Sequence, residues 1–205
     1  MKRLGLILFL LICYPDVISQ EYHIVGDDLY KIYGEEFNWD EIKASSFLVP
    51  DNKKYSKDYY DVSQINDGNE DTAWVEGVKG SGIGEWVKMI HVDWIRKKKY
   101  CMVNSVWIKN GYMKNRELYY ANNRVKKIRI EFSEGEKKEI ELKDGVFDYQ
   151  IFKLGEIKTK WVKVVILDAY KGKKHDDTCI SELQFWCYDK DWYKWGGKPI
   201  PKDIE

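Results

Sequence analysis

Proline and histidine are scarce in this sequence of 205 residues, and neither positive nor negative charge is in surplus. It contains 4 prolines and 3 histidines, and its 34 basic side chains balance 34 acidic ones. Balanced charge without a basic block argues against binding to nucleic acid and against polybasic attachment to a membrane. The histidines stand far apart and no Cys-x-x-Cys spacing occurs, which argues against a zinc site.

Long apolar runs are also missing after residue 19. Before it, a basic start and an apolar run from Leu4 to Ile12 lead to a cleavage site at Ser19, so residues 1–19 are predicted to be a signal peptide. The run is too short to span a bilayer, and the mature chain is expected to be exported without a transmembrane segment. A weak lipobox ending at Cys13 leaves a lipid anchor as an alternative, which the bulky Ile12 disfavours.

Cysteine is sparse as well. Removal of the signal peptide leaves Cys101, Cys179 and Cys187. In an oxidising compartment this odd number predicts one disulfide and one free thiol, and the spacing does not choose the pair.

Aromatic residues, in contrast, are abundant, with 9 Trp and 15 Tyr, and they favour strands as well as sugar-binding or protein-binding surfaces. The clearest two-residue period runs from Lys127 to Phe132 and returns after a Gly135 turn from Glu139 to Leu142, which predicts a β-hairpin. Further strands are predicted at residues 44–49, 86–94, 103–109, 147–154, 161–167 and 180–187.

These strands, without a helix of ten or more residues, predict an all-β fold: an antiparallel β-sandwich or jelly roll. The predicted sandwich covers residues 44–188, between an aromatic and acidic extension at residues 20–43 and an aromatic tail at residues 189–205.

The segment from Gln64 to Trp86 has neither the helical nor the strand period of apolar residues, and it is rich in glycine, carboxylates and amides. Its first part, Gln64 to Thr72, places oxygen-bearing side chains around Gly68, as calcium requires. The alternative is an Asn-Asp-Gly turn whose carboxylates are solvated.

A resemblance to a known family follows from several motifs in order. The run INDGNEDTAW, ending at Trp74, resembles the signature of the factor V/VIII type C, or discoidin-like, galactose-binding fold. The next run, VEGVKGSGIGEW, continues as in the NAD-glycohydrolase-type translocation domain, the glycan-binding subfamily of that fold. NGYMK, NNRVK, YKGK and DTCISEL resemble the later motifs, so the resemblance covers Ala44 to Trp186.

The resemblance implies a galactose-binding-like jelly roll with a structural calcium ion that ties the glycine-containing loop to the last strand. The implied calcium ligands are Gln64, Asp67, Asn69, Thr72, Ser181 and Glu182.

The motif positions also contain ring faces and hydrogen-bonding groups, which a sugar site needs. The predicted glycan-binding residues are Trp74, Glu76, Glu85, Asn110, Tyr112, Lys114, Asn122, Arg124 and Lys126. We expect them to lie together at one end of the sandwich. The alternatives are that Trp74 and Tyr112 are core aromatics and that Arg124 and Glu76 form a buried ion pair.

The function expected from this sequence is that of an exported, non-catalytic carbohydrate-binding module that attaches to a glycan or glycoconjugate. The alternative is an extracytoplasmic domain that binds another protein. A glycoside hydrolase is a weaker alternative: the pairs Asp176 with Asp177 and Glu76 with Glu85 offer carboxylates, but no nucleophile pattern, Walker loop or dinucleotide loop occurs.

Overall fold

The structure is a computed structural model that describes residues 35–36, 39–51, 53–91 and 100–187. The predicted signal peptide with Cys13, most of the extension at residues 20–43 and the tail at residues 189–205 lie outside the described residues. No helix in the described part of the chain is both long and apolar enough to cross a membrane.

Strands dominate the described residues, with one 3-10 helix and one short α-helix between them. In chain order the elements are β1 (Glu35–Glu36), β2 (Glu41–Ala44), η1 (Val62–Asn66), β3 (Trp74–Val75), β4 (Trp86–Ile90), β5 (Cys101–Asn110), α2 (Arg116–Ala121), β6 (Asn123–Phe132), β7 (Lys137–Glu141), β8 (Gln150–Thr159), β9 (Trp161–Tyr170) and β10 (Thr178–Cys187).

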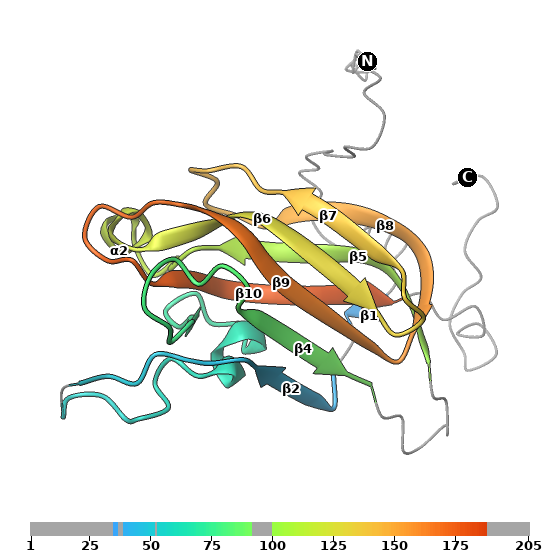
Figure 1. The fold of residues 1–205 in the computed structure, drawn as a ribbon, viewed down its shortest axis with the longest axis horizontal. Helices are drawn as coiled ribbons and strands as arrows, with labels where there is room; N and C mark the ends of the chain where they lie inside the picture. The colour runs from blue at the N-terminus through green and yellow to red at the C-terminus, as the bar shows by residue number, and fades with distance from the viewer. Residues whose placement is uncertain (1–34, 37–38, 52, 92–99, 188–205) are drawn as a thin grey trace, which may run out of the picture.

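The strands form one continuous sheet in the order β2-β4-β9-β6-β10-β5-β8, with β7 paired to β6 and β1 and β3 paired to β10. Among the strands of the described residues, every pairing is antiparallel except that of β6 with β10, which is parallel and joins Asn123 to Thr178 and Arg124 to Cys179. An isolated bridge between Gly111 and Ile180 is also parallel. The sheet folds over at this short junction, so that β4, β9, β6 and β7 form one layer and β10, β5 and β8 the other (Figure 1). The predicted β-sandwich is confirmed.

The core lies between these two layers. Ile128, Ile130 and Phe132 of β6 point into one hydrophobic cluster, which also contains Ile108 of β5 and Phe185 of β10. The intervening residues of β6 face away from the core, as the alternation predicts. The predicted hairpin is confirmed by the pairing of β6 with β7.

Two predicted strands are shifted along the chain relative to the structure. The first strand pairs from Glu41 and ends at Ala44, where the prediction began. The Ser45 N–H still donates to the Trp86 carbonyl of β4, but the chain then changes partner, and the Leu48 N–H donates to the Val75 carbonyl of β3. The strand predicted at residues 147–154 runs from 150 to 159, because Gly155 adopts a φ of 81° and lets the chain continue past a position where the prediction ended it.

Candidate functional site

Four segments converge at the end of the sandwich that carries α2 (Figure 1). The loop after β9 packs on α2, since the backbone N–H of Lys173 donates to the Tyr120 carbonyl at 2.9 Å and that of His175 to the Ala121 carbonyl at 2.9 Å. The start of β10 holds the glycine-rich loop, because the Thr178 hydroxyl donates to the Ser81 carbonyl at 2.8 Å. Of the predicted glycan-binding residues, Glu76 and Glu85 belong to the glycine-rich loop and Asn122 caps α2. The others lie on β3, β5 and β6 or between β5 and α2.

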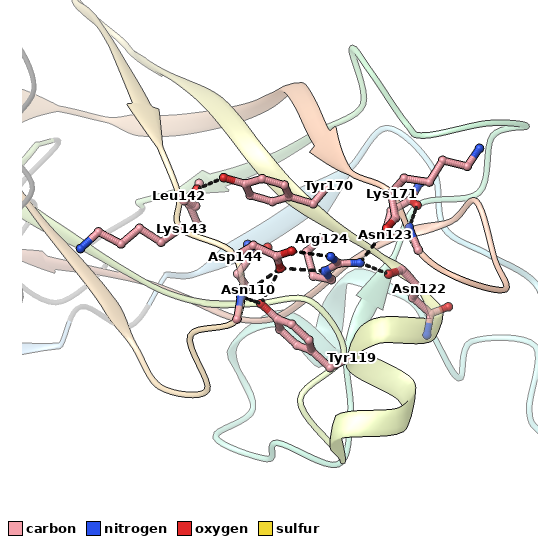
Figure 2. Close-up of polar contacts among 12 residues, drawn as sticks. Asn110, Tyr119, Asn122, Asn123, Arg124, Leu142, Lys143, Asp144, Tyr170 and Lys171 are labelled. Carbon is pink, nitrogen blue, oxygen red and sulfur yellow. Dashed lines mark hydrogen bonds and ion pairs between the residues drawn. The ribbon is translucent and has the colours of Figure 1, made fainter.

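Arg124 is the centre of this end. Figure 2 shows its guanidinium between the Asp144 carboxylate and two backbone carbonyls. Its Nε and NH2 groups donate to the two Asp144 oxygens at 3.1 and 2.7 Å, and its NH1 group donates to the carbonyls of Asn122 and Lys171 at 2.9 and 3.1 Å. With 4% of Arg124 exposed, the residue fastens α2, the turn after β7 and the loop after β9 to one another.

The alternative in which Arg124 and Glu76 form a buried ion pair is wrong, because the partner of Arg124 is Asp144. Glu76 is fully buried and accepts hydrogen bonds from the backbone N–H groups of Val78 and Thr178, at 2.9 and 3.0 Å. Burial raises the pKa of the Glu76 carboxyl, and these two hydrogen bonds oppose the rise. Glu76 therefore shapes the loop and offers no free oxygen to a ligand.

The contact with Glu76 explains why residue 82 of that loop is a glycine. It has a φ of 64°, and a Cβ at this position would lie 2.5 Å from Cγ of Glu76. The absence of a side chain lets the loop close over the buried carboxylate.

Three other predicted contacts are buried structural residues. Trp74 is completely buried and donates from its indole nitrogen to the Ser46 carbonyl at 3.0 Å, so its ring has no face for a sugar. Asn110 donates to and accepts from the backbone of Val125, at 2.7 and 2.8 Å, and joins β5 to β6. Tyr112 is 5% exposed and donates to the Asp71 carbonyl at 3.2 Å.

Of the remaining predicted contacts, Asn122 is also buried, and the other three lie nearer the surface. Asn122 donates to the Leu118 carbonyl at 2.9 Å and closes α2, while Glu85 accepts hydrogen bonds from the hydroxyls of Ser45 and Ser46. Lys126 pairs with Asp168 at 2.7 Å, and Lys114 is exposed. The structure thus brings the motif residues to one end, but few of them are available to a ligand.

Sequence reasoning missed two half-buried aromatic rings above this network. Tyr120 and Phe147 have ring centroids 6.0 Å apart, and each is flanked by a cation: Lys173 lies 5.4 Å from the Tyr120 ring and Arg116 lies 4.3 Å from the Phe147 ring. We call these four residues the aromatic patch. The four-residue spacing of Arg116 and Tyr120 on α2 was the only local signal for it.

The loop predicted to bind calcium is folded on itself beside the last strand. The Thr72 hydroxyl lies 2.8 Å from Oδ2 of Asp67 and 2.7 Å from the Asn69 carbonyl oxygen, so three predicted ligands converge. Gln64 belongs to η1, which packs against β10.

The other implied calcium ligands, Ser181 and Glu182 of β10, lie beneath this loop. Glu182 is fully buried and stands opposite Lys109 in the pairing of β10 with β5, and Lys109 forms an ion pair with Glu70 of the loop. Ser181 is also buried, and its hydroxyl accepts from the Met113 N–H at 2.9 Å. Two carboxylates with neutral oxygens are a donor set that suits calcium, so the residues present fit the ion.

Comparison with known proteins agrees with this fold. A family model described as the NAD glycohydrolase translocation F5/8 type C domain matches residues 32–186. No curated protein matches the chain significantly.

Several solved structures are similar. The CBM32-1 and CBM32-2 domains of Clostridium perfringens ZmpB are 17% identical with a TM-score of 0.51, over 78% of this chain and 37% of that one. Truncated AlyQ with CBM32 and alginate lyase domains is 10% identical with a TM-score of 0.50, over 76% and 34%. The arabinofuranosyltransferase AftD from Mycobacteria is 16% identical with a TM-score of 0.54, over 73% and 10%. The chain thus spans about a third or less of these proteins, and the likeness shows a shared fold.

Proposed function

The chain belongs to the NAD glycohydrolase translocation F5/8 type C domain family, and from this premise we propose that it is an exported, non-catalytic carbohydrate-binding module. The ligand contacts the end of the sandwich that carries α2. The CBM32 domains with the same fold are carbohydrate-binding modules by name, which supports this class of ligand.

The aromatic patch is the observation that carries the proposal. Sugar recognition needs a ring face for the C–H side of a pyranose and nearby donors for its hydroxyls. Tyr120 and Phe147 supply half-buried rings, and Arg116 and Lys173 supply donors beside them. The Arg124 network beneath holds the surrounding segments in place, so little ordering is needed when a ligand binds.

Three of the four carboxylates offered for a hydrolase are held in contacts within the protein. Both oxygens of Glu76 accept backbone hydrogen bonds, Glu85 is held by two serine hydroxyls, and Asp176 pairs with Lys171 at 2.9 Å. None of these three is arranged as the acid of a glycosidase, which needs a carboxyl group directed at the leaving oxygen.

A protein-binding face is the second candidate, and exposed apolar side chains favour it. Phe47 and Val49 lie on the loop after β2, and Val78 and Ile83 lie on the glycine-rich loop, with exposures between 38% and 54%. The two loops touch, because a Cβ on Gly77 would lie 2.3 Å from the Phe47 carbonyl oxygen.

A glycan array tests the first proposal. The wild-type protein is expected to bind a defined set of glycans, and Phe147→Ala is expected to weaken binding about tenfold or more by removing one ring face. Trp161→Ala is the matched control: this half-buried ring also carries a cation, Lys88 at 4.2 Å, but lies at the other end of β9. Equal loss in both variants, or no glycan binding together with a co-purifying protein, would contradict the proposal.

We also propose that calcium joins the loop at Asp67 to Glu182. Chelation is then expected to lower the melting temperature by about 5 °C or more, as loss of an ion bound only by the folded state requires. Glu182→Gln is expected to abolish this calcium-dependent shift. An unchanged melt, with no calcium in the purified protein, would rule out the site and leave Lys109 as the positive charge opposite Glu182.

A further inference from the structure

Two of the three cysteines are neighbours in the core. Cys187, at the end of β10, stands opposite Val103 of β5, and Cys101 lies two residues before Val103. Residues two apart on a strand share a face, and all three side chains belong to the same hydrophobic cluster. Cys101 and Cys187 are therefore diagonal neighbours on the inner face of an antiparallel pair.

Cys179 is too far from either. It lies on β10 eight residues before Cys187, a distance of about 26 Å along an extended strand. Its carbonyl accepts from the N–H of Gly111, which follows the far end of β5 from Cys101. Only one of the three possible pairs can meet.

The thiols of Cys101 and Cys187 already interact. All three cysteines are free and buried in this structure, and Cys101 donates weakly to the Thr159 carbonyl at 3.5 Å. The pKa of the Cys187 thiol is raised mainly by burial and further by a hydrogen bond with the Cys101 thiol.

We propose that Cys101 and Cys187 form a disulfide that joins β5 to β10 when the chain folds in an oxidising compartment, and that Cys179 remains a thiol. One thiolate attacks a disulfide of a small-molecule or protein oxidant to form a mixed disulfide, and the other thiolate then displaces the oxidant's second sulfur as a thiol. The two cysteines lose two protons and two electrons, and the oxidant's disulfide is reduced to two thiols.

The local backbone permits this closure with a small movement. Diagonal neighbours lie roughly 7 to 8 Å apart at Cα, whereas a disulfide usually spans about 4.4 to 6.8 Å. The ladder between β10 and β5 is already irregular here, since its register shifts between Trp186 and Cys187. The strand ends can therefore approach without breaking a regular run of hydrogen bonds.

The burial of both thiols determines at which stage the disulfide can form. Little Cys187 thiolate forms in the folded protein, so the reaction belongs to the folding stage, before the core closes. The folded protein is expected to resist both late oxidation and reduction without denaturant.

Peptide mapping of the full chain, refolded with oxidised and reduced glutathione, tests the pair. Trypsin leaves Cys179 and Cys187 in one peptide, because no lysine or arginine lies between them, so variants identify the partner. Cys179→Ser is expected to keep the crosslink to the Cys101 peptide, and Cys187→Ser to lose it. Oxidised wild-type protein should melt about 5 to 10 °C above Cys101→Ser, a difference that disappears when both are refolded reduced.

Two outcomes would overturn the proposal. One is a folded, oxidatively refolded protein in which Cys101 and Cys187 are both alkylated after denaturation. The other is a crosslink that persists in Cys187→Ser and disappears in Cys179→Ser.

Discussion

Replacing Arg124 with methionine is expected to lower the free energy of unfolding by about 2 to 4 kcal/mol, measured by urea denaturation at pH 7. The change removes the ion pair with Asp144 and the hydrogen bonds to two backbone carbonyls, while methionine preserves most of the buried stem. The estimate is below the full cost of a broken buried pair, because the Asp144 side chain is 34% exposed and solvent screens its charge.

The pH dependence of this stability difference is expected to identify Asp144 as the partner of Arg124. Burial alone would raise the pKa of Asp144, but hydrogen bonds and charge attraction from Arg124 outweigh it and lower the pKa below its usual 3.8. This contribution is present above the unfolded pKa and is lost as pH falls through the folded pKa, so the stability difference between wild type and Arg124→Met should narrow below about pH 4. The part that comes from the hydrogen bonds to the Asn122 and Lys171 carbonyls should remain.

Lys126→Met is the control for Arg124→Met, since it removes an ion pair between exposed side chains and should change stability little. Equal stabilities of wild type and Arg124→Met at pH 7 would show that the network does not hold this end together.

Replacing Trp74 with alanine is expected to lower the free energy of unfolding by about 3 to 5 kcal/mol, because it leaves a large cavity in the core and removes the donor to the Ser46 carbonyl. The conservative Trp74→Phe change should cost less and leave glycan binding intact. Urea denaturation and the glycan array measure the two effects separately. Loss of glycan binding by a stable Trp74→Phe protein would return Trp74 to the ligand site.

The strands were predictable where one face is buried. The alternation from Ile128 to Phe132 places every second side chain between the layers, and the turn at Gly135, with a φ of 94°, closes the hairpin. The first strand was misplaced because Ser45 and Ser46 use their hydroxyls to hold Glu85, a contact 40 residues away for Ser45, which local alternation does not encode.

The candidate site was predictable as a location but not as a set of contacts. Arg124 and Glu76 lie near other motif residues, since Arg124 bonds the Asn122 carbonyl and Glu76 packs against Gly82. The partner of Arg124, however, is Asp144, which the sequence presents as an ordinary Asp-Gly turn. The rings of Tyr120 and Phe147 meet only when the turn after β7 packs on α2. The motif residues that stabilise this end differ from those that a ligand can reach by their burial. Burial depends on tertiary packing, which the local sequence does not encode.

A crystal structure of the protein soaked with mixed oligosaccharides tests the central claim most directly. The claim predicts a sugar ring against Phe147 or Tyr120, within hydrogen-bonding distance of Arg116 or Lys173. A sugar bound on another surface, or no sugar at the α2 end under conditions in which the array shows binding, would contradict it.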